Sequence, residues 1–413
     1  MKLRDYELTD SITQAAPTGA DDFGVRPTQR VRKQLFPAAA WAATVFLMYR
    51  FIVAADYPLH DGDSVLYQSI ASSLASRPWA EWLVPMWPPG WSKTGRFVEH
   101  LPFFFWPTAA LGRLGLAHSA LLANLIYFLG CLYLLFRIAR PLVGAQSAWL
   151  ALALYVVSPL GIQYLVRANH ENAWAIGFLG ALYCLSNLPP RPLLGVGFVL
   201  FAAFAFSMKG VLALSLFPVL GLWWWVSSRR RGELLWFAAA VVAVASIALW
   251  YEGAYRQLTG ESFFAGYFEA QLTYAYRQER FGWLHKLTNL VYYPGNVIWF
   301  AFPSSILALI AVLRRRRAGK GLTQAQQLAF VGVGGFLALA IPVSRRAARY
   351  IFPAYPLIYV PAAELLCERA PKLAAWLRRN EAYLPYALML ILIVVLTGRI
   401  AAELRFYRFV QVF

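Results

Sequence analysis

The chain has 413 residues, of which 60% are hydrophobic and 14% are charged, and its formal net charge is +18. An average soluble domain has roughly 25% charged residues, whereas the mean hydropathy of this chain is +0.51, so the composition excludes a soluble protein and indicates an integral membrane protein. The basic residues are spread between apolar segments, which argues against nucleic acid as a partner and favours anionic lipid head groups and phosphates.

Residues 1–34 are polar, lack periodicity and end in a basic cluster. They are expected to form a disordered cytoplasmic tail whose basic residues keep the N-terminus inside. No cleavable signal peptide is expected, because the polar stretch is long and no A-x-A site follows the first apolar segment. Leu35–Ala54 is the first predicted span, and it delivers residues 55–117 to the outer face.

Two acids, Asp61 and Asp63, lie where the first hydrophobic helix should leave the bilayer. Carboxylates are costly at this position, so we interpret them as the active centre. In extended backbone, residues two apart point to the same side, so the two carboxylates could converge around Gly62. From Leu66 onward the apolar spacing predicts a short amphipathic helix. For such a helix, Asp63 or Ser64 would also be an ordinary N-cap, and capping and catalysis are not exclusive.

The same outer segment contains Leu101–Leu116, which is apolar but short and is interrupted by Pro102, Pro107 and Gly112. We expect an interfacial or re-entrant helix in this segment instead of a span. The remaining apolar segments predict ten further spans, near 118–136, 145–162, 172–188, 193–208, 210–226, 234–251, 293–313, 325–343, 350–367 and 383–398.

The sequence therefore predicts an all-α polytopic membrane protein with about 11 transmembrane helices and with interfacial helices in the long first outer loop. The connections assigned to the inside are short and strongly basic, such as Arg229–Arg231 and Arg314–Arg317, as the positive-inside bias requires. The tail after the last span is assigned to the outside. Residues 367–413 would then comprise a cytoplasmic connection, the last span and a short outer tail.

The predicted outer connections hold most of the acids and histidines. Arg167, His170 and Glu171 adjoin one span, where a charged pair could simply cap the helix. Lys209 follows another predicted span. A lysine at such a position most often snorkels, with its ammonium group at the lipid head groups, but its position on the same face as the acids favours phosphate binding.

Arginines also lie on this predicted outer face. Arg280 lies in a loop rich in aromatic residues, which suits either an aromatic belt or a lipid phosphate with its sugar. Arg346 and Arg349 lie where the positive-inside bias disfavours them, which indicates an anionic ligand.

Several short motifs occur in a recognisable order. Asp63–Tyr67 resembles a D-E-x-x-Y element with Ser64 in place of the glutamate, and Val98–Pro102 resembles an E-K-P-P segment with His100 in place of the lysine. Three further motifs follow. Arg167–Ala173 resembles a second acidic motif, with Glu171 in place of the usual aspartate. Ser207–Gly210 is similar to a T-K-G turn, and Arg349–Pro356 is similar to R-Y-x-x-P-x-x-P. Over about residues 35–366 the chain thus resembles the polytopic GT-C glycosyltransferases, in the protein-mannosyltransferase-like branch that includes bacterial aminoarabinose and galacturonic acid transferases of lipopolysaccharide.

The resemblance implies transfer of a sugar from a polyprenyl-phosphate carrier to a lipid or glycan acceptor, with inversion, at the periplasmic face of the inner membrane. Asp63 would be the general base and Asp61 a second candidate or an orienting partner. The leaving phosphate would meet cations. The residues expected to bind substrates are Lys209, Arg349, Tyr350, Arg346, Glu171, His170, Arg167, Tyr67, Glu99, His100 and Arg280.

The substitutions at positions 64 and 100 leave phosphate handling and metal ligation open, and no metal or other cofactor is expected to be required. The alternatives are a lipid or sugar transporter or flippase, and a protein O-mannosyltransferase. Against a transporter, the sequence shows no internal symmetry, and its charges gather at one face instead of the midplane. The sugar, the acceptor, the length of the carrier and the oligomeric state are not predicted.

Overall fold

The computed structural model describes the backbone of residues 27–412, with gaps at 58, 60, 92, 94, 189–190, 229, 274–281 and 344–345. It describes the side chains of residues 40–405, except in these gaps and in residues 272–286. Most of the described residues are helical, and they contain no β-strand, only a single bridge between Met86 and Arg96. The predicted all-α fold is therefore confirmed. The chain divides into two compact units, 1–44 and 45–413, and the site described below lies within the second.

The helical elements follow one another along the chain as α1 Pro27–Ala54, α2 Gly62–Ala75, η1 Trp79–Leu83, η2 Pro102–Phe104, α3 Phe105–Arg113, α4 Ser119–Val157, α5 Pro159–Leu165, α6 Glu171–Ser186, α7 Pro192–Lys209, η3 Gly210–Ser215, α8 Leu216–Ser227, η4 Arg231–Glu233, α9 Leu234–Thr259, α10 Phe263–Tyr267, η5 Phe268–Thr273, α12 Gly282–Phe300, α13 Ser304–Arg317, α14 Gln324–Ala340, η7 Ala348–Ala354, α15 Tyr355–Arg369, α16 Pro371–Arg379, η8 Glu381–Tyr383 and α17 Leu384–Val412.

Within the described residues, five helical stretches are long and apolar enough to cross a membrane: Ser119–Val157, Pro192–Ser227, Arg231–Thr259, Ala348–Arg369 and Glu381–Arg405. A bent pair, α12 with α13, would make a sixth. The chain is thus a multi-pass membrane protein. The count of about 11 spans stays a prediction, because further apolar helices such as α14 are shorter than the length expected of a straight span.

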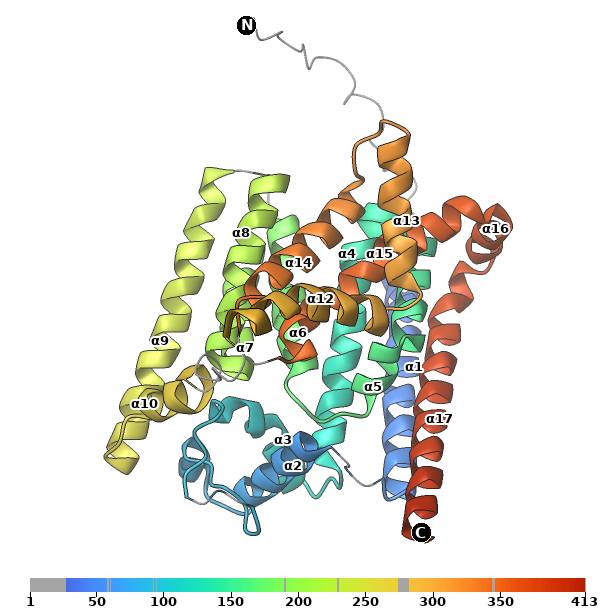
Figure 1. Ribbon diagram of the computed structural model, residues 1–413. Helices are drawn as coiled ribbons and strands as arrows, with labels where there is room; N and C mark the ends of the chain where they lie inside the picture. The colour runs from blue at the N-terminus through green and yellow to red at the C-terminus, as the bar shows by residue number, and fades with distance from the viewer. Residues whose placement is uncertain are drawn as a thin grey trace, which may run out of the picture. The chain divides into compact units, whose positions relative to one another are not determined.

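Three predicted spans differ from the structure in shape. The segment 293–313 was expected to be one span; in the structure it is bent by 105° between α12 and α13, so that it forms a broken span or a re-entrant loop. The break precedes Ser304, where Pro303 has no backbone N–H to continue the helix of α12. In Figure 1, α12 runs across its neighbours instead of along them. By contrast, α4 joins two predicted spans through a kink at Gly144, where φ is 80°.

The centre of the second unit is built on α6, whose residues are almost all buried. It packs closely on α7, because small side chains on both helices let the backbones approach. A Cβ added at Gly177 would lie 2.5 Å from the Cβ of Ala205, and one at Gly180 would enter the ring of Phe201. These contacts fix the start of α6 beside the end of α7, and both ends belong to the site.

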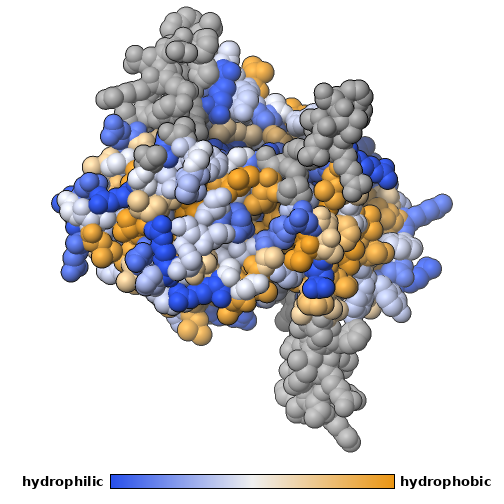
Figure 2. Space-filling model, turned by 90° about the horizontal axis from the view of Figure 1, so that it is seen from below, coloured by the Kyte–Doolittle hydropathy of each residue, from blue (hydrophilic) through white to orange (hydrophobic). Residues whose placement is uncertain are grey.

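The predicted amphipathic helix and the predicted interfacial helix both form, as α2 and α3, and they pack together at one end of the helices (Figure 1). The apolar face of α2, which includes Ile70 and Leu74, is buried against Phe105 and Ala109 of α3. Seen from this end, the surface mixes hydrophilic and hydrophobic residues (Figure 2). This pair of helices closes one side of the site.

Candidate active site

The first turn of α2 separates the two acids of the motif. Asp61 is the N-cap: its backbone is extended, and its Oδ1 accepts a hydrogen bond from the backbone N–H of Ser64 at 3.0 Å. The Ser64 hydroxyl donates to the other oxygen of Asp61 and accepts from the backbone N–H of Ala168 at 2.9 Å. The expectation that Asp63 or Ser64 caps the helix is therefore wrong, because the helix begins at Gly62. The expected convergence in extended backbone fails for the same reason.

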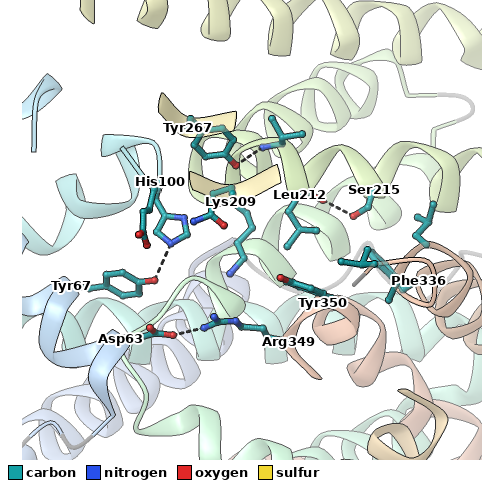
Figure 3. A pocket seen from close by; sticks show the side chains of 16 residues that line it. Asp63, Tyr67, His100, Lys209, Leu212, Ser215, Tyr267, Phe336, Arg349 and Tyr350 are labelled. Atoms are coloured by element: carbon teal, nitrogen blue, oxygen red, sulfur yellow. Dashed lines mark hydrogen bonds and ion pairs between the residues drawn. The ribbon is translucent and has the colours of Figure 1, made fainter. Parts of the chain in front are cut away.

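Asp63, in the first turn of α2, forms an ion pair with Arg349 of η7 (Figure 3). The side chain of Asp63 is 41% exposed and that of Arg349 is 29% exposed, so a ligand can approach both. Arg349 is held in place because η7 packs on α6. Residues 286 positions apart in the chain thus meet at one point.

Lys209 forms a second ion pair at the junction of α6 and α7. Its Nζ lies 3.0 Å from Oε1 of Glu171, and the two side chains are 7% and 0% exposed. The other carboxylate oxygen of Glu171 has no hydrogen-bond partner in the described part of the chain. Glu171 therefore lies behind Lys209 and orients its ammonium group.

The turn after Lys209 depends on Gly210, whose φ is 64°. A Cβ at this position would lie 2.5 Å from the hydroxyl oxygen of Tyr267. That hydroxyl accepts a hydrogen bond from the backbone N–H of Val211 at 3.2 Å. Glycine is thus required by the backbone conformation and by the packing of α10 on the turn.

Aromatic and imidazole rings form the wall next to Asp63. The hydroxyl of Tyr67 shares a hydrogen bond of 3.1 Å with Nε2 of His100. The ring of His170 lies 4.1 Å from that of His100 and 3.8 Å from that of Phe104. Its Nδ1 is 3.0 Å from the carbonyl oxygen of Met208, which can only accept, so Nδ1 carries the proton.

Burial lowers the pKa of His170 well below its ordinary value, and the neighbouring His100 and Lys209 lower it further. This imidazole is therefore neutral. Burial also raises the pKa of Tyr67 well above its ordinary value, with a further contribution from Asp63. Tyr67 remains a phenol that can share a proton in a hydrogen bond but does not ionise.

A cavity of about 310 Å³ connects these groups (Figure 3). One part of its lining is polar, and consists of Asp63, Tyr67, Glu99, His100, Lys209, Arg349 and Tyr350. Another part is apolar, and consists of Val211, Leu212, Phe336, Leu339, Ala340 and Val343, from η3 and from α14 and the residues that follow it. Ser215, Tyr267 and Gln271 complete the lining. Asp63, Lys209 and Arg349 were predicted to lie on the same outer face and to act on the same substrates, and all three line this cavity.

Other predicted residues do not line this cavity. Arg346 turns toward α12, where its Nε donates to Oδ1 of Asn289 at 2.9 Å. Arg167 lies over the ring of Tyr164, 5.7 Å from its centroid. Glu171 contacts Lys209 from outside the cavity, and the ring of His170 packs against those of His100 and Phe104. Asp61 is engaged with Ser64, and Arg280 lies outside the described residues.

The sequence analysis missed the apolar lining, Ser215 and Gln271. The apolar side chains occur in helical segments that look like any lipid-facing or core surface, so no local pattern distinguishes them. Tyr267 was recognised only as one of an aromatic group. No three His, Cys, Asp or Glu side chains within the described ranges are grouped closely enough to hold a metal ion.

The helices and the cavity between them define a GT-C fold, as the comparison with solved structures shows. The chain aligns with the crystal structure of ArnT from Cupriavidus metallidurans bound to undecaprenyl phosphate, at 16% identity and a TM-score of 0.61, covering 91% of this chain and 74% of that one. The alignment with the crystal structure of the same ArnT in the apo state has 14% identity and a TM-score of 0.63, and it covers 90% of this chain and 76% of that one.

A more distant similarity is found with the oligosaccharyltransferase AglB from Archaeoglobus fulgidus, in complex with an inhibitory peptide and a dolichol-phosphate. In this case the identity is 11% and the TM-score 0.50, covering 88% of this chain and 55% of that one. No family model and no curated protein sequence matches the chain. The expected GT-C architecture is therefore confirmed by structure, at a distance at which sequence comparison alone finds nothing.

Proposed function

We propose that the protein is a membrane glycosyltransferase that moves a sugar from a polyprenyl-phosphate carrier to a lipid or glycan acceptor. The observation that carries this proposal is the composition of the cavity, in which two carboxylates, Asp63 and Glu99, and two cations, Lys209 and Arg349, adjoin an apolar lining. A lipid-linked phosphate needs both kinds of surface. The similar structures of ArnT and AglB hold undecaprenyl phosphate and dolichol-phosphate, respectively, which supports the same ligand class for this chain.

Lys209 and Arg349 are proposed to bind the phosphate of the carrier. Both line the cavity, and they come from different elements, so they can approach an anion from two directions. As the sugar leaves, negative charge grows on the phosphate, and preorganised cations stabilise that charge most effectively where water is excluded. The isoprenoid chain would lie against η3 and α14.

Asp63 is proposed to act as the general base. The acceptor hydroxyl oxygen attacks the anomeric carbon, the bond from that carbon to the phosphate oxygen breaks, and the hydroxyl proton passes to Asp63. A positioned base of this kind contributes about 10² to 10⁴-fold to the rate. A single displacement inverts the anomeric carbon. Glu99, His100 and Tyr67, which line the same part of the cavity, would contact the sugar and the acceptor.

The ion pair between Asp63 and Arg349 gives the reaction an order. While Asp63 is paired with Arg349, one of its carboxylate oxygens is engaged with the guanidinium group and is not available to the acceptor hydroxyl. A carrier phosphate that binds Arg349 would compete with this pairing and free Asp63 for the acceptor proton. Donor binding would thus activate the base.

The active cavity is proposed to open on the periplasmic side of the inner membrane. The basic connections that include Arg231 and Arg314–Arg317 lie at the other ends of helices that reach the cavity, and the positive-inside bias favours the cytoplasm for them.

Purified protein in proteoliposomes, supplied with polyprenyl-phosphate sugars and acceptor lipids, tests the proposal. We expect transfer by the wild type, loss of at least about 10²-fold in Asp63→Asn, and wild-type transfer in Asp56→Asn, whose carboxylate is 98% exposed. Undiminished transfer by Asp63→Asn would refute the assignment of the base. Movement of the donor across the bilayer without transfer would instead favour a flippase.

A further inference from the structure

A second cavity, of about 400 Å³, lies at the opposite ends of helices that form the active cavity. Leu339 and Ala340 at the end of α14 line the active cavity, whereas Gln324 and Leu328 near its start line the second one. Phe336 also lines the active cavity. Because the helix rises about 1.5 Å per residue, the lining residues of the two cavities on α14 are separated by about 12 Å, from Leu328 to Phe336, up to about 24 Å, from Gln324 to Ala340. They therefore serve opposite faces of the bundle.

Glu233 is the unusual group in this second cavity. Its side chain lines the cavity, and the residue is 4% exposed. One carboxylate oxygen accepts a hydrogen bond from the hydroxyl of Ser228, while the other has no partner in the part of the chain that the structure describes. A buried acceptor without a donor destabilises the protein. A ligand that donates an N–H group to this oxygen would remove that cost, so the complex with the ligand would be stabilised.

The surroundings of Glu233 favour a ligand with two charges. The C-terminal ends of α6 and α8, at Ser186 and Ser227, carry partial negative charge into the same cavity and add to the attraction for a cation. Arg230 also lines the cavity and is exposed, so its guanidinium group is available to an anion. An apolar wall that includes Ile138 would accept hydrocarbon.

We propose that this cavity binds the phosphoethanolamine head group of a phospholipid in the leaflet opposite to the active cavity. The primary ammonium group donates to Glu233, the phosphate pairs with Arg230, and the glycerol and first methylenes contact the apolar wall. A choline head group keeps the positive charge but has no N–H donor, and a glycerol head group has no positive charge. The proposal is independent of the transferase activity.

Native mass spectrometry of the full-length protein, titrated with phosphatidylethanolamine, phosphatidylcholine or phosphatidylglycerol of the same acyl chains, tests the site. We expect the wild type to prefer phosphatidylethanolamine by about tenfold, the size of one charge-assisted hydrogen bond. Glu233→Gln should lose that preference. Glu368→Gln removes an exposed carboxylate at the same end of the bundle and should keep it. Equal binding of phosphatidylethanolamine and phosphatidylcholine by the wild type would overturn the proposal.

A second measurement on the wild type avoids the risk that Glu233→Gln folds poorly. A photoactivatable phosphatidylethanolamine should cross-link to residues of α6, α8 or η4 at this cavity, and unlabelled phosphatidylethanolamine should displace it far better than soluble phosphoethanolamine. Cross-links confined to the active cavity, or equal displacement by the soluble compound, would contradict a lipid site at this position. Arg230→Gln should weaken phosphatidylethanolamine and phosphatidylcholine alike.

Discussion

Lys209 pairs with the buried Glu171 and is proposed to bind the carrier phosphate, and these two roles can be separated. Because Glu171 is fully buried, removing its partner leaves an uncompensated charge, which typically destabilises a protein by about 3 to 5 kcal/mol. Lys209→Gln should therefore unfold at a clearly lower temperature than the wild type. The double variant Glu171→Gln/Lys209→Gln should recover most of that stability, because no charge remains unpaired.

Binding of undecaprenyl phosphate should not recover in the double variant, since the cation is still missing. Thermal unfolding followed by fluorescence and lipid binding by native mass spectrometry provide the two readouts. A double variant that is stable and binds the lipid phosphate like the wild type would show that Lys209 has only a structural role.

His170 predicts how stability depends on pH. In the unfolded chain its pKa is about 6.5, whereas burial lowers the pKa in the fold. Below about pH 6.5 the unfolded state therefore takes up a proton that the folded state does not, and stability falls as the pH falls. His170→Asn keeps a side-chain N–H for the carbonyl of Met208 but does not titrate. Its unfolding temperature should fall less than that of the wild type between pH 7 and pH 5; an equal fall would exclude this role for His170.

At the scale of elements, the turn between α7 and η3 fixes the position of Lys209. Gly210→Ala should destabilise the fold by about 1 to 3 kcal/mol and reduce sugar transfer, because a side chain is strained at φ 64° and meets Tyr267. Gly221→Ala, in the interior of α8 with open space at its Cβ, is the matched control and should be neutral or stabilising. Tyr267→Phe in the Gly210→Ala background should relieve part of the loss. Wild-type transfer and stability in Gly210→Ala would contradict this role of the turn.

The two acids at the start of α2 allow helix capping by Asp61 to be tested separately from the proposed catalysis by Asp63. Asp61→Ser retains a side-chain oxygen for the N-cap and should stay folded and active, whereas Asp61→Ala should lower the stability by about 1 kcal/mol. Circular dichroism melts and transfer assays would be measured on the same samples. A folded Asp61→Ser that is as inactive as Asp63→Asn would give Asp61 a role in the reaction.

These elements also show which features of the fold and of the site could be predicted from the sequence and which could not. The amphipathic spacing after Asp63 predicted α2, and the bias of charged residues toward one face predicted that positions 63, 209 and 349 lie on the same outer face and act on the same substrates. The helix start was misplaced because Asp61, Asp63 and Ser64 are all good N-caps and only the tertiary contact with Ala168 decides between them. Arg346 and Arg349 look equivalent in the sequence, yet only Arg349 reaches the cavity.

At the scale of the whole molecule, the helices bring together side chains that are hundreds of residues apart. The apolar half of the cavity could not be predicted, because it arises where η3 and α14 meet and has no local signature. The angle between α12 and α13 could not be predicted either, because 293–313 is apolar on both sides of Pro303, and only the backbone at this proline interrupts the helix. In this chain the two cavities lie toward opposite ends of α14, and we propose donor chemistry for one and a lipid head group for the other.

The proposed function depends above all on whether the cavity beside Asp63 holds a polyprenyl phosphate. A cryo-electron microscopy structure of the protein with added undecaprenyl phosphate would decide this. We predict phosphate density within hydrogen-bonding distance of both Lys209 and Arg349, the isoprenoid chain along η3 and α14, and Asp63 released from Arg349. Phosphate density elsewhere, with the pair between Asp63 and Arg349 intact, would contradict the proposal.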